Sequence, residues 1–345
     1  MNIEQQPFGT LTDGQDVTQI TLTNDHGTTL RVLTLGATWQ GFDVADGHGG
    51  QKNLLISYDN LHDYEATPFY VCKTVGRVAG RIGGATYAID GTTTTHTSDQ
   101  NENKNTLHGG KHGFSDVVWT VSDQHQDAES VAVTLTLAVD GTVDHFPGDM
   151  TVAVTYTLTN ADRATWTITG TSDAVTLFNP TVHTYFNVTD HHELSSQQLF
   201  INGRHRILLN DEKVPTGAFA DVTDTAYDFT KPVTVTEQLA KLAATTGGVE
   251  FDDAYRVNGS TDRPIATVSD PESGRALDLY SARNGLVIFT ADPYAYDQPE
   301  PTPFTALAME AQWLPDAIHH DGFGDIVLPA NAPQTYEISY QFRQN

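Results

Sequence analysis

The chain has 345 residues and is strongly acidic: 18 Lys and Arg stand against 44 Asp and Glu, which gives a formal charge of −26. Such a chain lacks the cationic surface that a phosphate backbone requires, so nucleic-acid binding is disfavoured, and anionic lipid would repel it. Only 18% of the residues are charged and 38% are hydrophobic. This composition is that of a folded protein and excludes an acidic disordered tail.

The N-terminus and the cysteine content bear on location. The first residues, MNIEQQPFGTLTDG, contain neither the basic nor the apolar segment of a secretory signal. No run approaches the roughly 20 apolar residues that span a bilayer. The single cysteine, Cys72, cannot form an intramolecular disulfide, which mildly favours a reducing compartment. We therefore expect a cytoplasmic protein with no membrane association.

Alternating apolar and polar residues predict strands. The clearest segments are Thr18–Thr23, Ser130–Val139, Thr151–Thr159 and Ala164–Thr169. Their period of two and their content of Thr and Val are typical of half-buried strands. Turn dipeptides punctuate the chain at Asp46-Gly47, Asp90-Gly91, Asp140-Gly141 and Asn202-Gly203.

One short surface helix is predicted at Val235–Ala244, where Leu239 and Leu242 are three residues apart and Gly247 and Gly248 follow. Strands without intervening helices argue against a parallel α/β sheet. We expect an all-β fold, a large antiparallel β-sandwich. No linker, composition shift or repeat divides the chain, so residues 1–345 are predicted to form a single domain.

Two arginines stand close together in the segment GRVAGRI, at Arg77 and Arg81. Their even spacing would put both on one side of a strand, and their spacing of four would put both on one face of a helix. A guanidinium suits sugar hydroxyls or a carboxylate. The alternative is a structural ion pair with one of the many acids of the chain.

Two histidines lie in contexts that suggest a site. His108 precedes Gly109-Gly110, and glycines let a backbone approach a ligand closely. His112 follows at a spacing used by metal pairs on helices, but the two glycines make a helix improbable, so we expect no metal here. His183 lies in the aromatic run FNPTVHTYFNV, where alternation puts it on one face with Tyr185 and Asn187, and with Asn179 if the register survives Pro180. Amides, imidazole and aromatic faces suit a carbohydrate pocket.

Carboxylates mark two further segments. Asp252 and Asp253 lie in FDDAY, a weak signal in so acidic a chain. Glu310 ends the apolar run Ala306–Met309 and is followed by Gln312. Partial burial would raise the pKa of Glu310 toward neutrality, which suits a general acid or base. The alternative is an exposed Glu on an edge strand.

Taken in order, these segments resemble the aldose 1-epimerase (galactose mutarotase) family from about Leu30 to Phe342. The matching segments are GRVAGRI, NTLHGGKHGF with the following Val118-Trp119, NPTVHTYFNV, FDDAY and MEAQWLPDA. The family fold is a large antiparallel β-sandwich, the galactose mutarotase-like supersandwich, and agrees with the predicted strands. Gly80 departs from the pattern, because many members have Asn before the second arginine.

The resemblance implies a role for each matched residue. Glu310 would be the base that takes the proton from the anomeric hydroxyl, and His183 the acid that protonates the ring oxygen. His108 would orient the sugar near that oxygen. The implied sugar contacts are Arg81 and Asp252, and we also predict that Asn179 and Gln312 bind the sugar. Both catalytic pKa values should lie near neutrality, with His183 near its ordinary ~6.5, and no metal or other cofactor is expected.

The implied activity is the interconversion of the α and β anomers of a neutral aldose, galactose or glucose. Two alternatives stay open: an epimerase that prefers maltose or another disaccharide, and a sugar-binding protein without catalysis. A phosphosugar is disfavoured as substrate by the charge of −26. The expected partner is a small neutral sugar, and the sequence does not indicate an oligomeric state.

Overall fold

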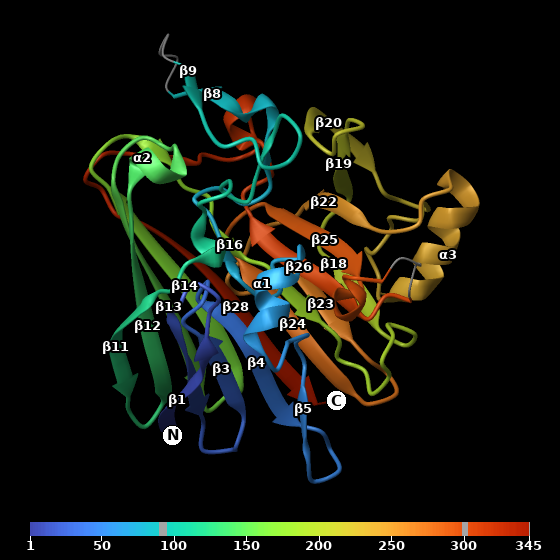
Figure 1. Cartoon of the computed structure of the whole chain (residues 1–345). Coiled ribbons are helices and arrows are strands. Elements are labelled where there is room, and N and C mark those ends of the chain that lie inside the picture. The colour runs from blue at the N-terminus through green and yellow to red at the C-terminus, as the bar shows by residue number, and fades with distance from the viewer. Residues whose placement is uncertain (90–94, 299–302, 345) are drawn as a thin grey trace.

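The computed structural model describes residues 1–89, 95–298 and 303–344. The predicted Asp90-Gly91 turn lies outside these residues. Strands far outnumber helices in the described chain, and all pairs between the named strands are antiparallel, as expected. Figure 1 shows long strands at the back of the molecule with shorter strands and loops in front of them.

Within the described residues, the largest sheet has nine strands. In spatial order they are β11 (Thr120–Gln126), β12 (Ser130–Val139), β13 (Met150–Thr159), β14 (Arg163–Ser172), β28 (Gln334–Gln344), β24 (Arg275–Ser281), β23 (Ala266–Ser269), β18 (Gln198–Ile201) and β21 (Val233–Thr234). Buried and partly exposed residues alternate along β13 and β14, so one face of this sheet supplies the core. The strands predicted at Ser130–Val139, Thr151–Thr159 and Ala164–Thr169 are confirmed.

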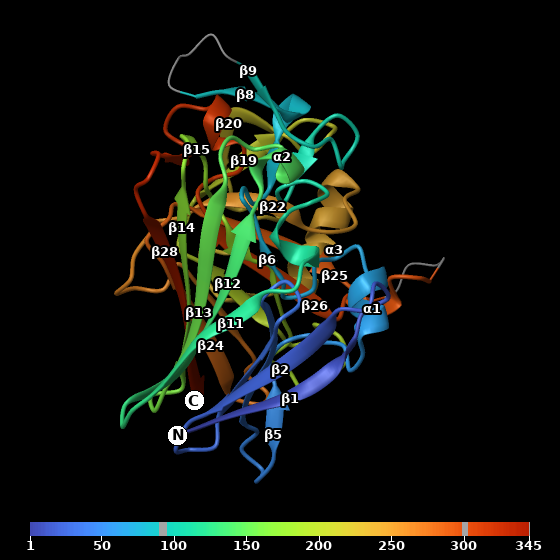
Figure 2. The same cartoon turned by 60° about the vertical axis from the view of Figure 1, so that its left-hand side comes forward.

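Two smaller sheets pack against the large one. The six-stranded sheet has the order β17 (Thr184–Phe186), β26 (Ala306–Gln312), β25 (Gly285–Ala291), β22 (Asp252–Arg256), β19 (His205–Leu209) and β20 (Pro215–Asp221). The five-stranded sheet has the order β1 (Asn2–Thr10), β2 (Asp16–Thr23), β3 (Thr29–Leu33), β4 (Thr38–Ala45) and β5 (Gln51–Asn53). In Figure 2, β1 and β2 lie to the right of the long strands β12, β13 and β14. The segment Thr18–Thr23 lies in β2, as predicted.

Aromatic side chains join the three sheets. The ring of Trp39 on β4 lies 4.7 Å from that of Tyr340 on β28, and Phe186 on β17 lies 5.7 Å from the same tyrosine. All three side chains are buried. Large aromatic rings bury much apolar area at such junctions, so this cluster holds the layers together as a sandwich.

Four pairs of short strands lie in the connections. They are β6 (Thr74–Val75) with β16 (Thr181–Val182), β7 (Arg81–Ile82) with β10 (Thr106–Leu107), β8 (Thr86–Ala88) with β9 (Thr95–Thr97), and β15 (Thr176–Leu177) with β27 (Val327–Leu328). Single 3₁₀ turns occur at Gly83–Ala85, Phe114–Asp116, Pro293–Ala295 and Ala317–His319. The first two strand pairs position several residues of the site described below.

The predicted helix is α3 (Val235–Thr246), two residues longer than expected. Thr234 caps its N-terminus, and Gly247 ends it in the left-handed conformation at φ 74°. Two shorter helices were not predicted, α1 (Leu61–Ala66) and α2 (Gly141–Asp144). The expected Asp140-Gly141 turn starts α2, with the Asp140 side chain as its cap. Among the described residues, no helix is long and apolar enough to cross a membrane.

Candidate active site

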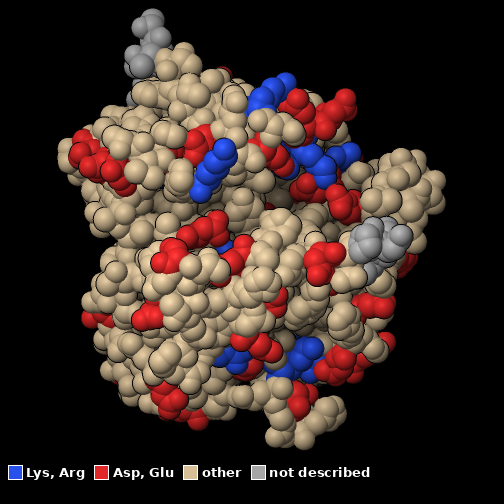
Figure 3. Space-filling model, viewed as in Figure 1, with Lys and Arg blue, Asp and Glu red and all other residues tan. Residues whose placement is uncertain are grey.

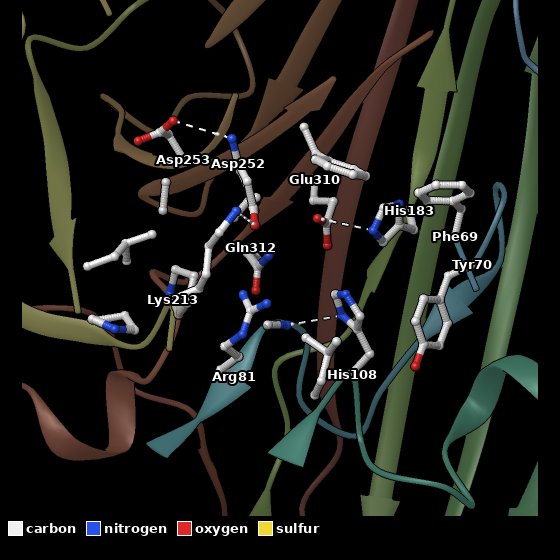
Figure 4. Close-up of a pocket in the computed structure, with 18 of the residues that line it drawn as sticks. Phe69, Tyr70, Arg81, His108, His183, Lys213, Asp252, Asp253, Glu310 and Gln312 are labelled. Atoms are coloured by element: carbon white, nitrogen blue, oxygen red, sulfur yellow. Dashed lines mark hydrogen bonds and ion pairs between the residues drawn. The ribbon is translucent and has the colours of Figure 1, made fainter. Parts of the chain in front are cut away.

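A cavity of about 240 Å³ opens beside β26, between the six-stranded sheet and the loops around β7 and β10. It brings together six of the seven residues expected in the site, although they are far apart in the sequence. These are Arg81, His108, His183, Asp252, Glu310 and Gln312. Figure 4 shows their side chains converging on one space.

Glu310 lies on β26, opposite Val287 of β25. All seven residues of β26 are buried, because neighbouring strands and overlying loops cover both faces. The carboxyl group is 2% exposed, and burial raises its pKa to about 8. The nearby charge of Asp252 acts in the same direction, whereas that of Arg81 opposes it. The expected rise in this pKa is therefore present, and its main cause is burial.

His183 lies between β16 and β17, with its Nε2 at 3.4 Å from Oε1 of Glu310. Its ring stacks on Tyr185 at 5.0 Å and on Tyr70 at 6.2 Å, so it is fixed between two aromatic rings. Burial lowers its pKa to about 4. The expectation of an ordinary pKa near 6.5 was wrong, because the sequence did not reveal that His183 is 4% exposed and packs against two tyrosine rings.

His108 follows β10 and is held by the chain opposite it. The backbone N–H of Gly80 donates to its Nδ1 at 3.2 Å. In the neutral ring the proton therefore sits on Nε2, which makes that nitrogen a donor. Burial, His183 and Arg81 all keep the pKa of His108 well below its ordinary value. His108 is thus a neutral hydrogen-bond donor, in keeping with its expected orienting role.

The glycines beside His108 are required by close packing. A Cβ on Gly109 would lie 1.8 Å from the carbonyl oxygen of Gly76, and Gly109 has φ of 90°. Gly80 itself has φ of 71°, and its backbone N–H donates to Nδ1 of His108. The glycine that replaces the family's Asn therefore still contributes to the site through its backbone.

The two arginines of GRVAGRI separate. Arg81 on β7 faces the cavity, and its Nε and Nη2 bind Glu102 at 2.5 and 2.7 Å. Arg77 turns away, is fully buried and binds Asp144 at 2.6 and 3.0 Å. The expectation that both arginines lie on one face was wrong, because the segment between Val75 and Arg81 forms no regular strand or helix. Arg77 thus forms a structural ion pair with an acid, the alternative interpretation of this segment.

Asp252 begins β22 at the other side of the cavity from His183 (Figure 4). Its Oδ2 accepts a hydrogen bond of 2.8 Å from Nζ of Lys213, which also reaches Glu250 at 3.3 Å. Lys213 lies in the turn between β19 and β20. The turn therefore orients the Asp252 carboxylate toward the cavity.

Several buried polar atoms around the cavity have no partner within the described parts of the chain. They are Nδ1 of His183, Oε2 of Glu310, and both Oε1 and Nε2 of Gln312. Buried polar groups are costly unless they are hydrogen-bonded. A polar ligand with several hydroxyls would supply the missing partners.

Asn179 does not line the cavity, contrary to expectation. Its Oδ1 accepts from the N–H of Trp313 at 3.0 Å, and its Nδ2 donates to the Trp313 carbonyl at 3.1 Å. Asn187 is likewise bound to main-chain carbonyls. The alternation fails to group Asn179 with His183 because the chain is irregular around Pro180, and Asn187 lies just after the end of β17. Asn179 instead holds the main chain at Trp313, directly after β26 ends at Gln312.

His108, His183 and Glu310 each offer a possible metal-ligand atom, and these atoms lie within 4.8 Å of one another. The state of His108 does not fit a metal. Its Nδ1 is occupied by the Gly80 N–H, and its Nε2 carries the proton and has no free lone pair. Binding a cation here would require breaking the contact with Gly80.

The aromatic wall and Lys213 were not expected from the sequence. Phe69 and Tyr70 line the cavity next to His183, and Phe289 lies 6.0 Å from Phe69. Phe69 and Tyr70 lie in an irregular loop, where no periodicity marks a buried face. The composition of the segment around Lys213 indicates a turn but does not indicate a functional site.

Comparisons with known proteins agree with this geometry. The family profile described as aldose 1-epimerase matches residues 18–341. The chain is 46% identical to a maltose epimerase of Levilactobacillus brevis over 99% of both chains, and 38% identical to an aldose 1-epimerase of Streptococcus thermophilus over 96% of this chain and 95% of that one. It superposes on the crystal structure of an aldose epimerase homologue from C. elegans with a TM-score of 0.82, at 25% identity over 94% of this chain and 98% of that chain.

A second solved structure, a galactose 1-epimerase from Lactobacillus acidophilus, superposes with a TM-score of 0.84 over 100% of this chain and 99% of that chain. At 24% identity this likeness supports the fold, which is galactose mutarotase-like as expected. The profile and the two relatives extend over nearly the whole sequence. This chain therefore belongs to the aldose 1-epimerase family of isomerases.

Proposed function

We propose that the cavity interconverts the α and β anomers of a neutral reducing sugar by acid–base ring opening. The observation that carries this proposal is the contact of 3.4 Å between Nε2 of His183 and Oε1 of Glu310, both buried in the cavity. One acid and one base at this spacing can reach the anomeric hydroxyl and the ring oxygen of the same sugar.

In the opening step, Glu310 takes the proton of the anomeric hydroxyl. The electrons of that O–H bond form the C1 carbonyl, the bond from C1 to the ring oxygen breaks, and the ring oxygen takes a proton from His183. The open aldehyde rotates about its C1–C2 bond. Reclosure on the other carbonyl face returns both protons, so the catalyst is unchanged.

The proton count of the pair fits these roles. Between the pKa of His183, about 4, and that of Glu310, about 8, the pair holds one proton. Opening needs this proton on His183 and the charge on Glu310, and the Arg81 guanidinium favours that carboxylate. Both arrangements contain the same number of protons, so their ratio does not change with pH in this range. The higher pKa of Glu310 places the proton there in the resting pair, and ring opening therefore starts from the minor arrangement.

We propose maltose, or a similar disaccharide, as the preferred sugar. The relative that is 46% identical over 99% of the chain is named a maltose epimerase. The Lys213 side chain at the cavity wall is 41% exposed, so the cavity stays open beside it. Phe69 and Tyr70 offer partly exposed aromatic faces that suit the C–H face of a second ring.

Galactose or glucose is the second candidate. It is favoured by relatives named aldose 1-epimerase, from Streptococcus thermophilus, and galactose mutarotase, from Homo sapiens, the latter 26% identical over 90% of both chains. Binding of a sugar without catalysis is disfavoured, because a binding site needs Arg81 and the aromatic rings but not a buried acid–base pair.

Polarimetry of freshly dissolved α-maltose, α-glucose and α-galactose tests the proposal. We expect accelerated mutarotation and the highest kcat/KM for maltose. A higher value for galactose or glucose would select the second candidate. No acceleration with any of the three sugars would contradict catalysis.

Three further expectations belong to this proposal. The reaction needs no metal, so a chelator should leave the rate unchanged.

We expect residues 1–345 to form one domain, which calorimetry would show as a single cooperative unfolding transition with equal calorimetric and van't Hoff enthalpies. The cytoplasmic location remains a prediction, and fractionation of the source cells would test it.

A further inference from the structure

Lys and Arg are scarce in this chain, and many of those described are paired with acids, as for Arg81 with Glu102 and Lys104 with Glu212. On the face in Figure 3, acidic side chains are widely spread and basic ones form a few small groups. Cations without acidic partners are therefore informative when they gather in one place.

Three such cations line a second pocket, of about 600 Å³. They are Arg204, Lys231 and Arg256, and His205 lies beside them. None of the three has a carboxylate of the described residues within ion-pair distance, although the charge of Arg204 still acts on the nearby Asp221. Among the residues that the structure describes, no Asp or Glu lines this pocket, which is otherwise formed by apolar and amide or hydroxyl side chains.

The pocket is held in shape by strand pairing and close packing. His205, the first residue of β19, pairs with Arg256, the last residue of β22. A Cβ on Gly203 would lie 2.3 Å from the Arg256 carbonyl oxygen, so the loop before β19 lies directly against the end of β22. This contact keeps Arg204 and Arg256 next to each other despite their like charges.

The charge balance nearby favours an anion. Asp221 pairs with His205 in the strand register, and the charges of His205 and Arg204 help to lower its pKa, so it offsets part of the positive charge. Its carboxylate accepts the N–H of Thr223 at 2.7 Å and does not line the pocket, where Lys231 and Arg256 remain without such a neighbour. The Arg256 guanidinium lies 5.4 Å from the centre of the Phe219 ring, which supports one face of its plane and leaves its N–H edge available. The N–H groups of a guanidinium can bind two phosphate oxygens at once, and a lysine ammonium adds a further positive charge.

We propose that this basic pocket (Arg204, His205, Lys231 and Arg256) binds a phosphate group, either free phosphate or that of a small phosphate monoester. A neutral sugar gains little from three clustered cations, whereas a dianion gains from each of them. The proposal concerns a site separate from the catalytic cavity, which contains Asp252, Asp253 and Glu310 and remains suited to a neutral substrate.

The same two strands connect the basic pocket to the catalytic cavity. At one end of β19 and β22 are His205 and Arg256, and at the other end Leu209 and Asp252 line the cavity. Four residues of strand span roughly 13 Å, so a phosphate bound here does not touch the reacting sugar. Binding is therefore expected to be independent of the sugar.

Isothermal titration with inorganic phosphate and with glucose 6-phosphate, at fixed ionic strength, tests the proposal on the full chain. We compare the wild type with Arg204→Gln/Lys231→Gln, two exposed positions whose change should not disturb folding. Lys111→Gln, at an exposed lysine outside this pocket, is the matched control.

We expect saturable binding by the wild type and the control, and binding at least about tenfold weaker in the double variant. Tighter binding of glucose 6-phosphate than of phosphate would support a monoester as the ligand, and equal binding would support free phosphate. Absence of saturable binding to either ligand, or equal binding by the double variant, would overturn the proposal. An unchanged rate of mutarotation in the double variant distinguishes this test from that of the proposed function.

Discussion

Nε2 of His183 lies 3.4 Å from Oε1 of Glu310, and both side chains are almost completely buried. The same burial moves their pKa values in opposite directions, because it disfavours the charged form of each. An acid with a lowered pKa and a base with a raised one then share a single proton over a wide pH range. This relationship leads to the first two predictions.

The pH dependence of kcat/KM is expected to be bell-shaped, with limbs near the pKa values of about 4 and about 8. Below the lower limb both groups are protonated and no base remains. Above the upper limb neither is protonated and no acid remains. Polarimetric rates across this range measure the profile, and a single limb near pH 6.5 would contradict it.

Glu310→Gln should stabilise the fold at alkaline pH. The pKa of Glu310 rises from 4.5 to about 8 on folding, so the folded state keeps a proton that the unfolded chain releases. This costs stability as pH rises from 4.5 toward 8, and glutamine removes the cost. We expect no gain in thermal stability at pH 4.5 and at least about 1 kcal/mol at pH 8.5. A variant less stable than the wild type at pH 8.5 would contradict this reasoning.

His108→Gln should slow the reaction without moving the pH limbs. Glutamine keeps a neutral donor but loses the ring that accepts the Gly80 N–H and contacts Tyr70. We expect kcat/KM to fall about tenfold to a hundredfold, as for the loss of one or two well-placed hydrogen bonds. The measurement is the pH profile of the variant. A shifted limb would mean that His108 itself titrates in the reaction.

Asp144→Asn should destabilise the fold and spare catalysis. The change leaves the fully buried guanidinium of Arg77 without its counter-charge, a loss of about 3–5 kcal/mol for such pairs. Arg77 does not line the cavity, so kcat/KM at 25 °C should stay near that of the wild type. Denaturant unfolding measures the loss, with exposed Asp262→Asn as the control. A fall in kcat/KM in a folded Asp144→Asn variant would mean that Arg77 supports the site.

The long strands were predictable because their alternation extends over many residues. Ser130–Val139 and Thr151–Thr159 have this pattern, and it corresponds to β12 and most of β13. The two-residue strands β7 and β10, which bring Arg81 next to Leu107 and His108, are too short to show a period. Their positions depend on tertiary contacts that no local pattern reveals.

The same limit applies to the site. Glu310 was predictable because it ends a continuous apolar run, which is typical of a buried strand. Lys213 and Tyr70 were not, because they come from irregular segments whose side-chain directions depend on distant strands. Asn179 was grouped with His183 on the condition that the strand register survives Pro180, and the chain does not keep that register.

The most direct test of the acid–base pair is the rate of Glu310→Gln on the best substrate, combined with its affinity for that sugar. We expect the catalysed rate to fall about 10²–10⁴-fold, because one proton transfer is lost, while calorimetry shows that the sugar still binds. Mutarotation at the wild-type rate by the folded variant would contradict a catalytic role for Glu310.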